Sequence, residues 1–226
     1  MGKTGVSAVW HDSNESWEFR ELPLPDLEND AIQVKVEATS VCGSDLHIWR
    51  GDGIDTKKHP RDPFVFGHEM MGTVAFMGNK VTTDSLRNPL KEGDRIAFSY
   101  FFPCAKCYNC IRGEFGACKF RLGRKPLEEW PVCKGGFAQY YYLRSPHYIF
   151  KLPDEISNAS AAPINCALAQ VYDALHLGGV MMGDNIVIQG AGGLGINATA
   201  IANELGASKI IVIDGQKPRL DLAVQC

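Results

Sequence analysis

Residues 185–214 read NIVIQGAGGLGINATAIANELGASKIIVID, and this stretch decides the fold of the second half of the chain. The apolar run 185–189 predicts a short buried strand, and the run 209–214 predicts another. A glycine-rich turn and the segment INATAIANELG (196–206), which has the composition of a helix, lie between them. A strand, a helix and a second strand in this order indicate one βαβ unit with parallel strands.

The turn carries the pattern G-x-G-x-x-G at Gly190, Gly192 and Gly195. Gly190 would make the tight turn, Gly192 would let the backbone approach a pyrophosphate, and Gly195 would let the helix pack on the strand. The N-terminus of that helix would offer free N–H groups to the phosphates. The alternative interpretation is an α/β unit with a glycine turn and no nucleotide.

An acidic residue follows at the spacing that a dinucleotide site requires. Asp214 lies at the end of the second strand, where its carboxylate can accept hydrogen bonds from ribose hydroxyls and would repel a 2′-phosphate. This favours NAD over NADP, although Lys217 and Arg219 lie nearby and weaken the inference. The residues that we expect to bind the cofactor are Gly190, Gly192, Gly193, Leu194, Gly195, Asp214 and Arg219.

Four cysteines cluster in the first half, in the pattern C-x2-C-x2-C-x7-C: Cys104, Cys107, Cys110 and Cys118. Four thiolates in one short loop suit a tetrahedral zinc ion with bonds of about 2.3 Å, and they leave no open position for chemistry. Disulfides are one alternative. An iron–sulfur cluster is another, but its usual run has the fourth cysteine after three residues and followed by proline. Here Lys119 follows the fourth cysteine.

The rest of the first half has the pattern of short strands. Ile32, Val34 and Val36 alternate with polar residues, as in a half-buried strand. Further apolar or aromatic runs, separated by turn residues, cover 64–78, 95–101, 137–143 and 147–152. This spacing is typical of a barrel or a sandwich.

Near residue 155 the composition changes to that of a helix. The stretch 157–177 is rich in Ala and Leu, with Ser157 or Ser160 as its N-cap. A last helix begins near Pro218 and reads as unfinished at Cys226.

Composition excludes several classes of function. The 226 residues include 23 basic and 26 acidic ones, for a net charge of −3, and no block of like charges suggests a nucleic-acid partner. No apolar stretch approaches the roughly 20 residues of a membrane span, and the first residues lack the core of a signal peptide. We therefore expect a cytoplasmic protein that acts on small molecules.

Two further motifs complete a recognisable set. Cys42 lies in VCGSDLH and His68 lies in FGHEM, before the cysteine cluster. After the cluster come GGFAQY, then APINCALAQVYDAL with Cys166, then the glycine turn. In this order the motifs cover the whole chain, which resembles the zinc-dependent alcohol dehydrogenases of the medium-chain dehydrogenase/reductase family.

The resemblance implies an α/β multidomain fold. A GroES-like β-barrel catalytic domain would cover 1–168, with the structural zinc lobe at about 100–120 as an excursion from it. Residues 169–226 would form the first βαβ part of a Rossmann NAD-binding domain. Family members are about half as long again, so we expect a C-terminally truncated chain, and a homo-oligomer for the full-length form.

The resemblance also implies a catalytic zinc held by Cys42, His68 and Cys166. Glu69 would lie beside the metal, as an occasional extra ligand or an electrostatic support. Asp45 would orient a ligand histidine by a hydrogen bond. Ser44 and His47 would relay a proton, first through the hydroxyl and then through the imidazole. Cys166 leans away from the sorbitol-type members, which would be expected to have a glutamate there.

The implied activity is hydride transfer between an alcohol (primary, secondary or polyol) and NAD, with two zinc ions per chain. The alternative function is a non-catalytic, zinc-binding fragment of such an enzyme that cannot bind the cofactor at this length.

Overall fold

The computed structural model describes residues 3–12, 16–52, 63–120 and 135–226. The chain forms two compact units, Met1–Asn165 and Cys166–Cys226. The boundary falls inside a single π-helical turn, η2 (Ile164–Leu168). The domain limits predicted above, 1–168 and 169–226, remain a prediction.

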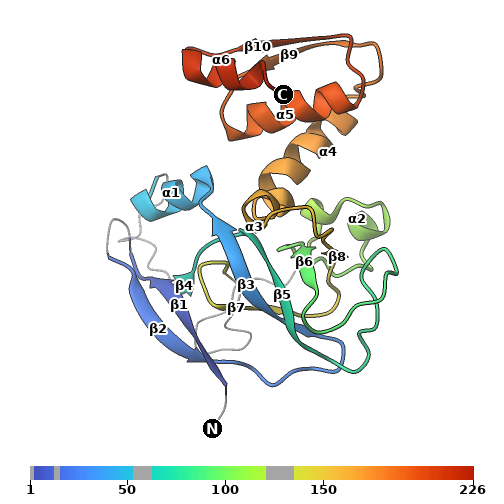
Figure 1. Ribbon diagram of the computed structural model, residues 1–226. Helices are drawn as coiled ribbons and strands as arrows, with labels where there is room; N and C mark the ends of the chain where they lie inside the picture. The colour runs from blue at the N-terminus through green and yellow to red at the C-terminus, as the bar shows by residue number, and fades with distance from the viewer. Residues whose placement is uncertain (1–2, 13–15, 53–62, 121–134) are drawn as a thin grey trace. The chain divides into compact units, whose positions relative to one another are not determined.

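A five-stranded antiparallel sheet forms the centre of the first unit, and its strands run in the order β7-β3-β5-β6-β8 (Figure 1). These strands are β3 (Ile32–Ser40), β5 (Glu69–Met77), β6 (Arg95–Phe98), β7 (Tyr140–Leu143) and β8 (Ile149–Lys151). Apolar side chains from all five strands, among them Val34, Met70 and Phe98, pack into one buried cluster. Each of the predicted apolar runs therefore contributes at least one strand.

A three-stranded sheet completes the barrel-like unit, in the order β2-β1-β4. It consists of β1 (Thr4–Trp10), β2 (Glu18–Pro23) and β4 (Phe64–Val65). A bridge between Ser7 and Ala138 joins β1 to the segment that precedes β7. The rings of Trp10, Phe64 and Phe66 pack together at about 5 Å between centroids, which anchors this sheet.

The alternation predicted for β3 holds for only part of the strand. Lys35 and Glu37 are exposed as expected, but Gln33 is buried, with 3% of its surface accessible. Its two amide atoms have no hydrogen-bond partner among the described residues. Lys35 pairs with β5 and β7 in the same way and is exposed, so strand pairing is not the reason. The expectation was wrong because Gln33 lies beside Leu24, Leu27 and Phe76, which line one cavity with it and shield it from solvent.

The CGSDLH motif supplies the N-cap and the first residues of helix α1 (Gly43–Arg50). Cys42 is its N-cap, and the Asp45 carboxylate reaches back to accept the Cys42 N–H at 3.0 Å. This is the second half of a capping box, which satisfies a backbone donor that the first turn leaves free. Gly51 ends the helix in the left-handed conformation.

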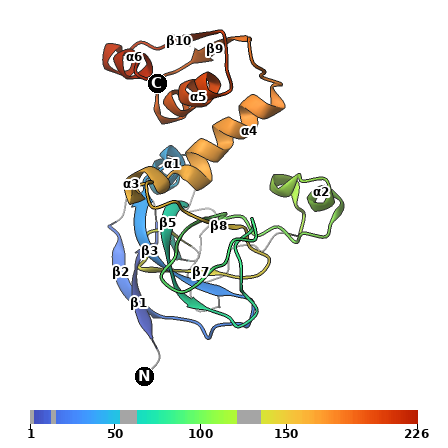
Figure 2. The same cartoon turned by 45° about the vertical axis from the view of Figure 1, so that its right-hand side comes forward.

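The cysteine lobe contains helix α2 (Tyr108–Ile111) and the 3-10 turn η1 (Phe115–Ala117). Figure 2 shows α2 standing apart from the strands of its own unit. Secondary structure this short cannot bury a core, so the lobe needs another source of stability.

The helix predicted over 157–177 is interrupted. Ser157 caps α3 (Asn158–Ala161), its hydroxyl accepting the Ser160 N–H at 3.1 Å. Pro163 follows, and a proline removes a helical hydrogen bond and clashes with the preceding turn. The chain continues as η2 and then as α4 (Ala169–Leu177). The expectation of one continuous helix was therefore wrong.

The second unit contains the predicted βαβ arrangement. Parallel strands β9 (Asn185–Gln189) and β10 (Lys209–Ile213) flank helix α5 (Gly193–Glu204) in the chain. The helix begins three residues earlier than predicted, because Gly192 is its N-cap. Helix α6 (Lys217–Ala223) has its proline in the first turn and ends before Cys226.

The two strands are not buried as predicted. Only Ile188 is buried in β9, and no residue of β10 is. Val187 is 63% exposed, and Ile211 and Ile213 are about half exposed. A two-stranded sheet offers few neighbours to its side chains, so an apolar sequence alone does not bury a strand. Within the described ranges, every helix is too short or too polar to reach across a lipid bilayer.

Asp84 provides a test of how the long connection between β5 and β6 is held. Its buried carboxylate accepts the N–H groups of Leu86 and Asn88, and also that of Lys151 in β8. Burial raises the pKa of Asp84, but hydrogen bonds from Asn88, Lys151 and Leu86 outweigh it and hold the pKa below 3.8.

We expect Asp84→Ala to lower the free energy of unfolding by about 2–4 kcal/mol, because it removes the carboxylate that accepts the N–H groups of Leu86, Asn88 and Lys151. Since the folded pKa is depressed, this stabilisation is present above about pH 4 and is lost as the pH falls through the folded pKa. Urea denaturation at pH 7 and pH 3 measures both effects. Asp154→Ala, at an exposed carboxylate, is the control. An equal effect of the two substitutions at pH 7 would contradict the assignment.

Candidate functional site

The four cysteines of the lobe converge as one ion would require. The Sγ–Sγ distances are 3.5 Å for Cys107 and Cys110, 3.9 Å for Cys104 and Cys110, and 3.9 Å for Cys107 and Cys118. All four sulfur atoms lie within 4.8 Å of one another. A tetrahedron with metal–sulfur bonds of about 2.3 Å has edges of about 3.8 Å. The donor set therefore fits a single tetrahedral zinc ion.

The same distances argue against the alternatives. A disulfide brings two sulfur atoms to about 2.05 Å, whereas these four cysteines are all free. An iron–sulfur cluster distributes its cysteines over different iron atoms, which separates the thiolates more widely. The geometry favours one ion that all four sulfur atoms share.

Hydrogen bonds already favour thiolates in the lobe. The Cys110 backbone N–H lowers the pKa of Cys107 to about 6, and the Cys104 N–H, 3.4 Å from the Cys118 sulfur, lowers the pKa of Cys118. Burial and the neighbouring thiols raise the pKa of Cys110 to about 12. A divalent cation among these sulfur atoms would offset the repulsion that opposes deprotonation of the last thiol.

A second group of ligand atoms comes from three separate stretches of chain. Cys42 caps α1, His68 directly precedes β5, Glu69 begins β5, and Cys166 lies in η2 immediately after the end of the first unit. One ligand atom from each lies within 4.8 Å of the others. Glu69 and Cys166 are buried, while Cys42 and His68 are partly accessible. Two sulfur atoms and one imidazole nitrogen match a zinc-ligand set that keeps a fourth position open.

Asp45 orients the histidine of this group. Its buried carboxylate lies 3.3 Å from His68 Nδ1 while the other oxygen accepts the Cys42 N–H. The Asp45 carboxylate raises the pKa of His68 against burial, which lowers it. A proton held on Nδ1 would leave Nε2 as the ligand atom, and the role of Asp45 in orienting a ligand histidine stays a prediction.

The Cys42 thiol is also tuned by its neighbours. Burial raises the pKa of Cys42, but hydrogen bonds from Ser44 and His68 outweigh it, so the pKa lies below its usual value. This favours the thiolate, which is the form that binds metal.

Sequence reasoning missed two neighbours of the group. The Ser40 hydroxyl donates to Glu69 Oε2 at 2.6 Å, which holds that carboxylate at the end of β3. The ring of Tyr100 lies against His68, with 5.1 Å between ring centroids. No motif marks either residue, because both contacts depend on how the strands pair.

The predicted proton relay is only partly assembled. Ser44 Oγ lies 3.5 Å from His68 Nε2, at the mouth of the ligand group. The His47 ring is 68% exposed, and its Nδ1 lies 2.8 Å from an Asp52 carboxylate oxygen. Within the described ranges no hydrogen bond joins Ser44 to His47, so the relay remains a prediction.

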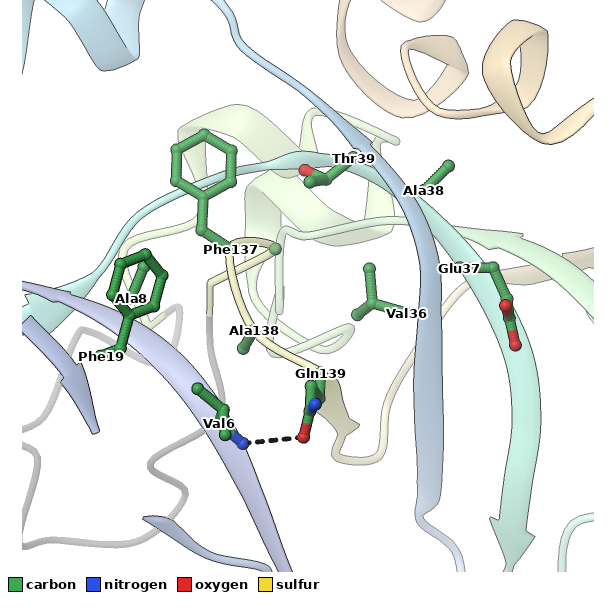
Figure 3. Close-up of a pocket in the computed structure, with 11 residues that line it drawn as sticks. Val6, Ala8, Phe19, Val36, Glu37, Ala38, Thr39, Phe137, Ala138 and Gln139 are labelled. Atoms are coloured by element: carbon green, nitrogen blue, oxygen red, sulfur yellow. Dashed lines mark hydrogen bonds between the residues drawn. The ribbon is translucent and has the colours of Figure 1, made fainter. Parts of the chain in front are cut away.

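Among the cavities that border the strands of the first unit, two touch the second half of β3. One, of about 420 Å³, lies between β1, β3 and the segment before β7, and none of the predicted site residues lines it (Figure 3). In this view the Val6 N–H donates to Gln139 Oε1. The other, of about 520 Å³, borders Asp45 on α1 and is lined by Trp17, Thr39, Val41, Leu46, Trp49 and Phe137. The second cavity therefore places apolar surface beside the residue that orients His68.

The three glycines of the turn differ in backbone conformation and in what surrounds them. Gly190 has a φ of +93°, which favours glycine. A Cβ on Gly195 would overlap the Gly190 carbonyl oxygen, so this glycine permits close packing of helix on strand. A Cβ on Gly192 or Gly193 would meet no protein atom, and the exposed Leu194 follows. The open space at the N-terminus of α5 fits a phosphate group.

Asp214 makes contacts that its spacing did not reveal. Its two oxygens accept the N–H groups of Ala191 and Gln216, each at 2.7 Å, and Arg219 Nη1 lies 3.7 Å away. These two backbone hydrogen bonds, with Arg219, lower the pKa of Asp214. A carboxylate has about four acceptor sites, but only 8% of the Asp214 side chain is exposed, so the binding of ribose hydroxyls there stays a prediction. Asp214 thus also ties the glycine turn to the end of β10.

Comparison with known proteins agrees with this architecture. The alcohol dehydrogenase GroES-like domain family matches residues 28–154. The fold is that of the medium-chain dehydrogenases, a GroES-like barrel followed by a βαβ unit, as the resemblance predicted. The chain belongs to the alcohol dehydrogenase GroES-like family.

Particular relatives are named for polyol or alcohol chemistry. The chain is 35% identical to a probable D-xylulose reductase A of Neosartorya fischeri, over 91% of this chain and 54% of that protein. An alcohol dehydrogenase of Thermotoga maritima superposes with a TM-score of 0.87 at 29% identity, over 99% of this chain and 61% of the other. Galactitol-1-phosphate dehydrogenase of Escherichia coli superposes with a TM-score of 0.79 at 27% identity, over 97% of this chain and 58% of the other. The chain spans about half the length of the curated relatives that it matches.

The lobe offers a direct test of its proposed metal. We expect Cys118→Ser to lower the zinc content by about one ion per chain, because three thiolates and a hydroxyl hold zinc less tightly than four thiolates. Elemental analysis after dialysis against a weak chelator measures the loss. Cys226→Ser, at an exposed thiol outside both groups, is the control. Equal zinc content in the two variants would exclude a zinc ion in the lobe.

Proposed function

We propose that this chain is the metal-binding catalytic domain and the start of the cofactor-binding domain of a zinc-dependent dehydrogenase that oxidises an alcohol or polyol, or reduces the matching carbonyl. The observation that carries the proposal is the convergence of Cys42, His68 and Cys166 within 4.8 Å. Family membership and the glycine turn support it independently.

Different residues of the chain would hold the two zinc ions and orient their ligands. Cys42, His68 and Cys166 would hold the catalytic zinc, and the lobe would hold a second zinc that stabilises structure. When bound, zinc supplies a Lewis acid that lowers the pKa of the substrate hydroxyl, and the nicotinamide supplies the acceptor for the hydride. Asp45 keeps His68 in the ligating tautomer.

The hydroxyl proton must leave as the carbonyl forms. Ser44 Oγ, at the mouth of the ligand group, would accept that proton and pass its own toward His47. The exposed His47 ring, paired with Asp52, would release the proton to solvent. Glu69, held by Ser40, would add negative charge beside the metal.

NAD, rather than NADP, is the proposed cofactor. The open N-terminus of α5 suits the pyrophosphate, and the Asp214 carboxylate disfavours a 2′-phosphate. The positive charge of Arg219 would favour NADP. Its guanidinium already lies 3.7 Å from Asp214, however, and this reduces the charge that it could offer to a 2′-phosphate.

The substrate class is proposed to be a polyol or a simple secondary alcohol. Relatives named D-xylulose reductase and galactitol-1-phosphate dehydrogenase support the polyol. Cys166 stands where a sorbitol-type member would be expected to have a glutamate, but the names of these relatives favour a polyol. Four free thiols kept together suit a reducing compartment, so we propose a cytoplasmic enzyme, and a homo-oligomer for the full-length form.

The activity is tested with purified, zinc-loaded protein, NAD, and a panel of primary alcohols, secondary alcohols and polyols. NADH formation at 340 nm that disappears in Cys42→Ser supports the proposal. Cys226→Ser should leave the rate unchanged. Two zinc ions per chain with neither NADH formation nor NAD binding would favour the alternative, a zinc-binding fragment without catalysis.

The glycine turn gives a matched pair of substitutions for cofactor binding. Gly195→Ala should destabilise the second unit by about 1–3 kcal/mol, because its Cβ overlaps the Gly190 carbonyl. Gly192→Ala should change the stability by less than about 1 kcal/mol, yet weaken NAD binding about tenfold by filling the space proposed for the pyrophosphate. Thermal unfolding and calorimetric titration with NAD separate the two effects. Unchanged NAD affinity in Gly192→Ala would contradict this placement of the cofactor.

A further inference from the structure

Side-chain hydrogen bonds tie together the segments that carry the ligands of the Cys42 group. Cys42 and His68 share the carboxylate of Asp45, and Glu69 is bonded to Ser40. These contacts join α1 and β3 to the start of β5. Cys166 lies instead in the short turn η2, and the neighbouring side chain, Asn165, bonds to the sheet.

Asn165 donates both of its side-chain hydrogen bonds to strand carbonyls. Nδ2 lies 3.3 Å from the carbonyl oxygen of Met70 in β5 and 3.1 Å from that of Phe98 in β6. Because both partners are acceptors, the amide nitrogen must face them, which fixes the orientation of the side chain.

The position of these carbonyls explains why an amide is needed. The ladder between β5 and β6 runs from the pair Thr73–Arg95 to the pair Met71–Ala97. Met70 and Phe98 are the next residues along the two strands, where the ladder opens. The Asn165 amide bridges the strands there, and Ile164 packs on the apolar cluster around Met71 and Ala97.

This bridge lies one residue from Cys166 and one residue from Glu69. Met70 follows His68 and Glu69 directly, so the hydrogen bond at Met70 links the segment that carries two ligands to the turn that carries the third. The Asn165 Oδ1 is buried and has no partner among the described residues. Among the described residues, Asn165 therefore holds the two strands only through the two hydrogen bonds that its Nδ2 donates.

We propose that Asn165 is a positioning residue that sets the Cys166 thiolate within reach of the metal by clamping η2 to the open end of the β5–β6 ladder. The inference rests on the proposed function, because it requires the catalytic metal group. Asn165 acts through Cys166 and touches neither substrate nor metal.

The test is metal affinity rather than turnover. Asn165→Asp keeps the size of the side chain but turns a carboxylate oxygen toward two carbonyl oxygens. We expect it to weaken the zinc ion of the Cys42 group about 10–100-fold in competition with a chelator, while the four-cysteine site is unchanged. Asn109→Asp is the matched control, because the Asn109 amide donates to the Ala117 carbonyl in the lobe and should affect only the four-cysteine site. Cys42→Ser identifies which zinc ion is which.

Stepwise loading with cobalt(II) gives a second readout, since sites with two and with four thiolates absorb differently. Raised free zinc should restore the occupancy of the weakened site in Asn165→Asp.

Should that variant fail to fold, Asn165→Ala removes the donors without adding charge and is measured in the same way. Circular dichroism and urea denaturation measure the folding of each variant, because the four cysteines of the lobe come from one short segment and can hold zinc without the barrel.

The zinc affinities separate a failure of the positioning role of Asn165 from a failure of the proposed dehydrogenase function. Two zinc ions of unchanged affinity in the Asn165 variants would overturn the positioning role and leave the proposed function standing. Weakening of both sites together would show a general structural role and would also overturn it. A wild-type chain that binds zinc only at the four cysteines would remove the proposed function and this inference with it.

Discussion

The buried carboxylate of Asp45 holds Cys42 and His68 together where the pairing of β3 with β5 ends, at Ser40 and Glu69. One oxygen closes the N-terminus of α1 at Cys42, and the other lies against the His68 ring. A charged group out of water is costly unless its acceptor sites are filled, so both contacts are required together. Helix capping and the orientation of a metal ligand therefore depend on the same side chain. If the helix loosens, the ligand loses its orientation.

The two metal-binding groups are assembled in different ways. In the lobe, all four cysteines come from one short segment, and the metal would supply the stability that its short helical turns lack. The other group takes ligands from α1, β5 and η2, so its geometry depends on the completed sheet. The barrel has its own apolar cluster, so its folding does not require the free energy of metal binding at this second group. The lobe can therefore use its metal for structure, while the second group can keep an open position for chemistry.

In the second unit, backbone geometry matters more than side-chain packing. Gly190 and Gly195 let α5 approach the strand, and Asp214 ties the turn to β10 through the Ala191 N–H. The apolar faces of β9 and β10 remain largely exposed. The conformation of the turn thus depends on the glycines at 190 and 195, which the spacing shows, and on a bond from Asp214, 23 residues beyond Ala191, which the spacing does not show.

The sequence by itself determined the features that depend on near neighbours along the chain. These are the cysteine spacing of the lobe, the roles of Gly190 and Gly195, and the order of strands and helices. Family resemblance added the set Cys42, His68 and Cys166. Tertiary structure alone decided that Gln33 is buried and that Ser40, Tyr100 and Asn165 lie beside the residues of the second metal group. Such contacts join residues far apart in the chain, and only the pairing of the strands brings them together.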